Sequence, residues 1–116
     1  MKSEYELSKH RFYELKHFCL QYPEWEKEYE ELDGYRKKLI SEENDTTSQE
    51  GIRRAELSYN MMIVGKTCEE ICSKAGYALD VFLLVAFDIK PHLVSGKEDF
   101  WYYYRKFFWE LSRRKS

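Results

Sequence analysis

The sequence predicts an all-α fold, a compact bundle of four to five helices. Three observations indicate this class. Apolar residues recur with the helical period, Pro and Gly are sparse (two and five among 116 residues), and no segment shows the alternation of a β-strand. The composition, 43% hydrophobic and 34% charged, is globular. We expect a single helical domain over residues 1–116, with helices in 1–40 and 50–116 and a mobile loop at 41–49.

The first two helices should occupy residues 1–40. The apolar side chains of the first recur every three or four positions and are Phe12, Leu15, Cys19 and Tyr22. This helix should end near Gln21, because Pro23 suits the first turn of a second helix, where its missing N–H costs nothing. The apolar stripe of the second helix comprises Trp25, Tyr29, Leu32 and Leu39.

Two helices are expected directly after the loop. The apolar stripe of the longer one comprises Ile52, Ala55, Tyr59, Met62, Ile63, Cys68, Ile71, Cys72 and Ala75. Lys74 and Gly76 form a signal for its end. The segment 77–87 is apolar nearly all round, and a helix without a polar face is expected at the buried centre of the bundle. The dipeptide Lys90-Pro91 should break the chain, because the residue before a proline avoids the helical conformation.

The last helix, expected to open with a capping box at Ser95-x-x-Glu98 and to run to about Arg113, contains eight aromatic residues in ten positions. One helix face is too narrow to bury all of them. Its best core stripe comprises Phe100, Tyr104, Phe107, Phe108 and Leu111. The rings left near the surface are Trp101, Tyr102 or Tyr103, and Trp109, which lie beside Arg105 and Lys106. Exposed aromatic rings mixed with arginine are typical of binding interfaces.

The C-terminal third also has the outline of a helix-turn-helix, with a buried helix, a short connection through Ser95-Gly96 and a basic helix. Residues 95–116 carry a net charge of +3, whereas residues 1–94 carry −5. Glu98 and Asp99 count against DNA as the partner, because carboxylates in the first turn of a recognition helix repel phosphates. The candidate binding residues are Lys97, Trp101, Tyr102, Arg105, Lys106, Trp109, Arg113 and Arg114.

No pattern in the sequence indicates catalysis or a cofactor. Cys68 and Cys72 lie one helical turn apart and could share a zinc ion with His10, His17 or His92. No CxxC or HxxxH pattern accompanies them, so we expect buried structural thiols and no metal. Neither a Gly-rich phosphate loop nor a supported Cys-His nucleophile pair is present, so we expect that the protein is not an enzyme.

The longest apolar run, 81–87, is too short to cross a bilayer, so no membrane association is expected. The polar N-terminal residues and the odd number of cysteines, three, predict a reducing cytoplasmic compartment.

Three segments, 13–32, 45–70 and 99–115, resemble a family of small proteins encoded by phages and prophages of Firmicutes. These are described as sigma-factor-like or late-gene-type helix-turn-helix transcriptional regulators. The most specific blocks are 19–25 and 105–108. The resemblance implies a bacterial host cytoplasm and a C-terminal helix-turn-helix similar to the promoter-reading region of sigma factors. The residues that would then face DNA are Lys97, Tyr102, Arg105 and Lys106.

The sequence leaves three hypotheses open. The first is a phage-type regulator that binds duplex DNA, RNA polymerase or both through its last helix. The second is a phage-encoded, anti-CRISPR-like inhibitor of a bacterial defence nuclease, whose acidic body occludes a nucleic-acid channel. The third is a helical module that homodimerises through the aromatic helix, which is compatible with either of the others.

Overall fold

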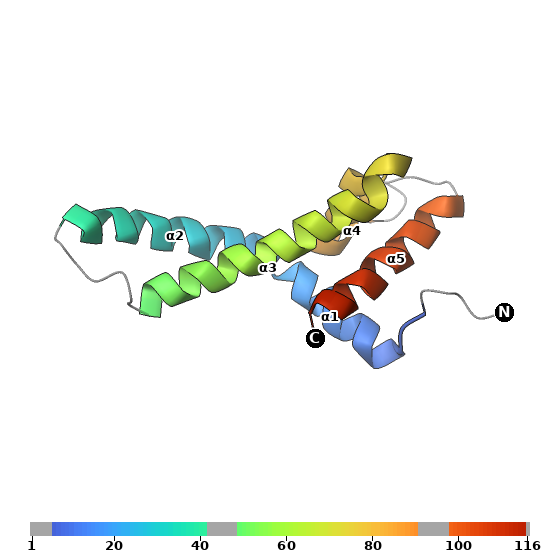
Figure 1. The fold of residues 1–116 in the computed structure, drawn as a ribbon, viewed down its shortest axis with the longest axis horizontal. Coiled ribbons are helices and arrows are strands. Elements are labelled where there is room, and N and C mark those ends of the chain that lie inside the picture. Colours follow the sequence, from blue (N-terminus) through green and yellow to red (C-terminus); the bar gives the residue numbers. More distant parts are fainter. Residues whose placement is uncertain (1–5, 42–48, 91–97, 116) are drawn as a thin grey trace.

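The computed structural model describes residues 6–41, 49–90 and 98–115, with the side chains of 35–41 left out. Within these ranges the chain is an all-α bundle, as predicted (Figure 1). Its elements are α1 (Lys9–Leu20), α2 (Tyr22–Ser41), α3 (Gln49–Cys72), the short 3-10 helix η1 (Ser73–Ala75), α4 (Ala78–Phe87) and α5 (Glu98–Arg114). Residues 42–48 of the predicted loop, the connection 91–96 and Lys97 lie outside the described residues, as does the side chain of Leu39.

The helices form an elongated body of 60 × 27 × 22 Å. The long helix α3 runs through it and packs on α2, α4 and α5. Figure 1 shows α2 and the first half of α3 as a two-helix arm, with α1, α4 and α5 gathered at the other end. Both α4 and α5 pack chiefly on α1 and α3.

The helix over 77–87 is not the buried centre that its composition predicted. Leu79 is 67% exposed and Phe87 is 39% exposed, although Val81 and Val85 are fully buried. This helix has only ten residues and packs through one side, so its other side meets solvent. The central position belongs to α3, which is long enough to contact helices at both ends.

Local signals account for the ends of the helices. The Ser8 side chain caps α1 by accepting a hydrogen bond of 3.2 Å from the Arg11 backbone N–H. This helix ends at Gln21, as predicted. Gly76 adopts the left-handed conformation (φ 79°) that confirms the predicted stop after α3 and η1. Asp88, also left-handed (φ 52°), ends α4 two residues before Lys90, since a short polar side chain tolerates this conformation.

The predicted core stripes of α1 and α5 are largely confirmed, whereas that of α3 is wrong in its first half. All five predicted residues of α5 are buried. In α3, Ile52 is 64% exposed and Tyr59 54% exposed, while Leu57 and Val64 fill the core instead. Apolar residues occupy both sides of this half of α3, and only the side facing α2 is covered. The predicted burial of Cys68 and Cys72 is confirmed.

Ion pairs fix the pairing of α2 with α3 along the arm. Arg53 bonds Glu28 over 2.6 Å, and Arg54 bonds Asp33 over 3.1 Å. The Arg54 guanidinium also lies 4.9 Å from the centre of the Tyr29 ring. These side chains are partly exposed, so each pair contributes about 1 kcal/mol or less. Their main effect is to orient the two helices.

Candidate nucleic-acid interface on the last helix

Buried contacts on one side of α5 decide which of its residues face outward. Phe100, Phe107 and Leu111 are fully buried, because α5 lies against both α3 and α1. At its C-terminal end, Arg114 donates a hydrogen bond of 2.9 Å to Thr67 Oγ1 and pairs with Glu70. The rotation of α5 about its own axis is therefore fixed by the core and by polar contacts with α3.

The face of α5 opposite the core carries rings and cations in alternation. Tyr102, Lys106, Trp109 and Arg113 follow one another at spacings of four, three and four residues, which places them along one side of a helix. The Lys106 ammonium lies 5.9 Å from the Tyr102 ring centre, and the Arg113 guanidinium lies 4.9 Å from that of Trp109. We call these four residues the outward stripe.

The structure separates the predicted binding residues into groups. Trp101 and Tyr102 are 38% and 37% exposed, so the expectation that these rings reach the surface is confirmed. Arg105 and Arg113 are exposed, while Lys106 and Trp109 are half-buried. Tyr103, the alternative to Tyr102, packs on Tyr77 with ring centres 5.9 Å apart. Arg114 is already bonded to α3 and serves the packing of the helix. Lys97 lies outside the described residues.

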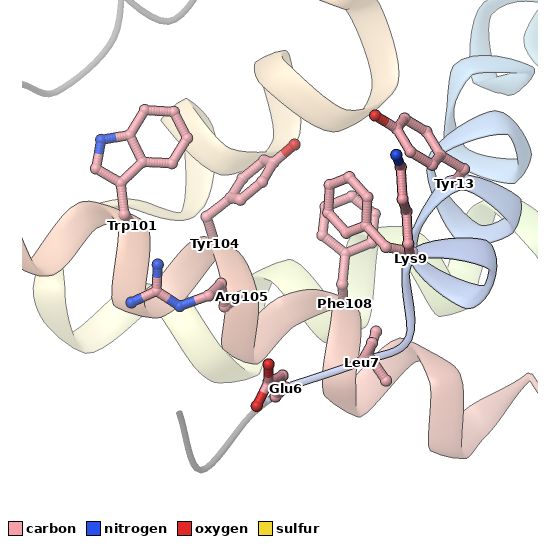
Figure 2. Close-up of a pocket in the computed structure, with 9 residues that line it drawn as sticks. Glu6, Leu7, Lys9, Tyr13, Trp101, Tyr104, Arg105 and Phe108 are labelled. Atoms are coloured by element: carbon pink, nitrogen blue, oxygen red, sulfur yellow. The ribbon is translucent and has the colours of Figure 1, made fainter. Parts of the chain in front are cut away.

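A groove runs between the start of α1 and the first half of α5 (Figure 2). Its volume is about 540 Å³, and we call it the α1–α5 groove. The residues that line it are Glu6, Leu7, Lys9, Phe12, Tyr13, Trp101, Tyr104, Arg105 and Phe108. Phe12 and Phe108, whose ring centres are 4.9 Å apart, join its two sides.

The contribution of α1 to this groove was missed in the sequence, because nothing in the local pattern shows that Lys9 or Tyr13 meets a helix some ninety residues later. Figure 2 shows Arg105 extending beside Trp101, with Lys9 and Tyr13 projecting from the α1 side. Burial raises the pKa of the Tyr104 phenol to about 12, so its hydroxyl stays protonated at neutral pH.

A second exposed surface lies on the arm. Ile52, Ala55, Tyr59 and Met62 share the side of α3 that the bundle leaves uncovered, at spacings of three, four and three residues. We call these residues the α3 stripe. A contiguous apolar strip of this kind is characteristic of protein-binding surfaces rather than of solvated helix faces.

The three cysteines are buried free thiols and form no site among the described residues. Burial raises the pKa of each thiol, to about 12 for Cys72. No group of three His, Cys, Asp or Glu side chains in the described ranges is placed to hold a metal ion. Among the described residues, therefore, nothing supports the alternative of a zinc site at Cys68 and Cys72 with His10 or His17, and His92 lies outside these residues.

No helix in the described part of the chain is both long and apolar enough to cross a membrane. Comparison with models of protein families, with curated proteins and with solved structures found no match. The resemblance to phage regulators therefore stays a prediction, and the function is inferred from the residues and their geometry.

Proposed function

We propose that this protein is a non-enzymatic, phage-type regulatory protein that binds duplex DNA through the outward face of α5, alone or together with RNA polymerase. The observation that carries the proposal is the outward stripe, in which a cation follows each aromatic ring on the surface of a rigidly held helix. The resemblance to phage regulators in the same helix supports it.

The cations on this face suit a phosphate backbone. Arg105, Lys106 and Arg113 all belong to exposed or half-buried positions of one helix, and Arg105 has no ion pair with a described residue. Lys106 and Arg113 lie over aromatic rings, which help to hold the cations in place, and Arg113 also lies 3.9 Å from Glu110. Lys and Arg that neutralise phosphates release counterions, and this supplies most of the affinity of non-specific DNA binding.

Of the two carboxylates that oppose DNA binding, Glu98 and Asp99, Asp99 accepts a hydrogen bond from within the fold. The Tyr77 hydroxyl donates a hydrogen bond of 2.8 Å to Asp99, which ties the start of α5 to the start of α4. Glu98 is exposed and lies at the far end of the helix from Arg113. The repulsion of phosphates should therefore be greatest at the N-terminal turn, so we expect the DNA to lie toward the middle and C-terminal part of α5.

A mobility-shift assay with duplex DNA across a range of salt concentrations tests the proposal. About three phosphate contacts predict a slope of about −2.7 for log K against log salt concentration. Absence of any shift at low salt would end the proposal, because the electrostatic contribution is then at its largest.

A protein-binding inhibitor is the second candidate, and the α3 stripe is the observation that favours it. Its exposed Tyr59 ring and its other apolar side chains offer apolar area that DNA does not use. The target would be a host protein such as RNA polymerase or a defence nuclease, toward which the acidic body of residues 1–94 could imitate nucleic acid.

Affinity capture from a host lysate, with and without nuclease treatment, separates the two candidates. DNA binding predicts that captured material disappears after nuclease treatment and is reduced in the Arg113→Gln variant. Binding to a host protein predicts a captured protein that survives nuclease treatment and is lost in Met62→Glu. The two variants change exposed or partly exposed residues on different helices, so each is the matched control of the other.

A further inference from the structure

We propose that the α1–α5 groove binds an unpaired nucleotide, whose base stacks on Trp101 and whose phosphate is held by Arg105. This inference rests on the proposed function, since it names a second form of nucleic acid that the same helix recognises. It concerns a different set of residues from the outward stripe.

The lining of the groove supplies flat apolar surfaces at its floor and its rims. Trp101 and Tyr13 are exposed rings from opposite sides, while Phe108 and Tyr104 are buried beneath them. Trp101 is braced by Tyr104, with ring centres 5.3 Å apart in an edge-to-face arrangement, so one face of the indole is not covered by that ring. Stacking on aromatic side chains is the usual way in which proteins hold unpaired bases, because every base has a π face.

The charges of the groove favour an anionic ligand over a neutral aromatic one. Lys9 and Arg105 contribute two positive charges, and Glu6 contributes one negative charge. Figure 2 shows the Arg105 guanidinium next to Trp101, so a phosphate on Arg105 would leave its base within reach of the indole. A guanidinium presents several N–H donors in a plane that matches two phosphate oxygens.

The size and position of the groove agree with this ligand. Its volume of about 540 Å³ falls in the usual range for small-molecule sites, about 300–1,000 Å³. Trp101 and Arg105 each precede a residue of the outward stripe, Tyr102 and Lys106. A strand whose backbone follows the stripe could therefore place one unpaired nucleotide in the groove without leaving the helix.

Tryptophan fluorescence of the full chain, titrated with a short oligothymidine, tests the inference. The titration is made in Trp109→Phe, because the half-buried Trp109 of the outward stripe would otherwise also respond to a bound strand. We expect quenching, because a stacked thymine contacts the exposed indole of Trp101, whereas Trp25 is buried. The quenching should disappear when Trp101→Phe is added. Anisotropy of a labelled oligothymidine should show affinity about tenfold weaker in Trp101→Ala, given the usual contribution of one stacked base. Tyr59→Ala, an exposed ring on α3, should bind like the unmodified protein.

A second pair of variants tests the phosphate contact. Arg105→Gln should make the salt slope of oligothymidine binding shallower by about 0.7, the value for one phosphate contact on a single strand. Lys66→Gln, which removes an exposed cation of α3, should leave the slope unchanged. Thymidine monophosphate, titrated separately, shows whether a free nucleotide is enough or a strand is required, and quenching of Trp101 by either supports the groove.

Other outcomes overturn the inference. Quenching that persists in Trp101→Phe would place the ligand elsewhere. Quenching of Trp101 by an acidic, tyrosine-containing peptide but by no nucleotide would assign the groove to a protein partner. Retardation of duplex DNA without quenching by any unpaired nucleotide would refute the groove site and retain the proposed function. Quenching by an unpaired nucleotide without retardation of duplex DNA would support the groove site and refute the proposed binding of duplex DNA.

Discussion

The Arg11 guanidinium donates a hydrogen bond of 2.8 Å from Nε to Ser112 Oγ, which joins the first helix to the last. Its Nη2 also donates to the backbone carbonyls of Ser112 (3.0 Å) and Lys115 (2.5 Å). The last carbonyls of a helix have no partner within that helix. Arg11 therefore caps the C-terminal end of α5 from outside and fixes the side of the groove that α1 provides.

Replacement of Arg11 by alanine should destabilise the fold. The substitution removes several charge-assisted hydrogen bonds. Each contributes less than a buried bond would, because the Arg11 side chain is partly exposed, so the free energy of unfolding should fall by about 1–2 kcal/mol. Urea denaturation followed by circular dichroism measures this. Lys9→Ala removes a nearby exposed cation and should change stability by less than about 0.5 kcal/mol. Equal effects of the two substitutions would contradict the capping role.

The two classes of aromatic residue in α5 should differ sharply in their effect on stability. Phe107 is fully buried, so Phe107→Ala should cost about 3–5 kcal/mol through lost burial and the cavity that remains. Trp101 is 38% exposed, and Trp101→Ala should cost about 1 kcal/mol or less. Thermal unfolding of both variants checks this. A large loss in Trp101→Ala would mean that the indole belongs to the core.

The outward stripe should control the salt dependence of duplex binding. Arg113→Gln removes one cation and should make the slope of log K against log salt shallower by about 0.9. The side chain lies over Trp109 at the surface, so the fold should be retained. Lys66→Gln, on the exposed side of α3, provides the matched control. A slope that is equal in both variants would remove α5 from the duplex interface.

Acid should weaken two ion pairs between helices. The hydrogen bond from Arg114 lowers the pKa of Glu70 below its ordinary value of 4.5, and the bond from Arg53 lowers that of Glu28. A carboxyl group whose pKa is lower in the folded state stabilises the fold above its ordinary pKa. That contribution disappears as the pH falls through the folded-state value.

Urea denaturation at pH values from neutrality to below 4.5 should therefore show stability that declines at the acidic end, and Glu70→Gln should reduce the decline. Glu69→Gln, which changes an exposed neighbour on α3, should leave the decline in stability unchanged. A decline that is identical in Glu70→Gln and the unmodified protein would show that the pair with Arg114 does not contribute.

The thiols should be unreactive until the protein unfolds. A pKa of about 12 for Cys72, compared with 9.0 for an ordinary thiol, leaves about a thousandfold less thiolate at neutral pH. Burial raises the pKa values of Cys19 and Cys68 as well. Ellman's reagent should detect all three thiols rapidly in denaturant and only slowly without it. Rapid modification of the native protein would show that this part of the core opens.

The sequence predicted α5 well because its pattern admits one solution. Phe100, Phe107 and Leu111 lie on one side, charged residues lie on the other, and the surplus of rings had to reach the surface. One helix face is too narrow for all the aromatic side chains of α5, so the outward position of Trp101 and Tyr102 could be predicted.

The arm and the groove could not be predicted in the same way. In α3, Ile52 and Tyr59 lie on one side and Leu57 on another, so periodicity alone does not say which side meets α2. The groove depends on a contact between α1 and α5, which are far apart in the chain, and no local pattern encodes that pairing. The composition of 77–87 was misleading because burial depends on how many neighbours surround a helix as well as on its apolar content.

The position of α3 gives one continuous helix two unequal environments. Its first turns are covered by α2 alone, whereas its second half is enclosed by α4 and α5 and carries the buried Val64 and Cys68. Backbone amides in the first turns can therefore open to solvent without disturbing the rest, while those around Val64 are released only when the whole bundle comes apart. A ligand seated on α5 would protect the second group and leave the first unchanged, so the arm and the body respond to binding as separate cooperative units.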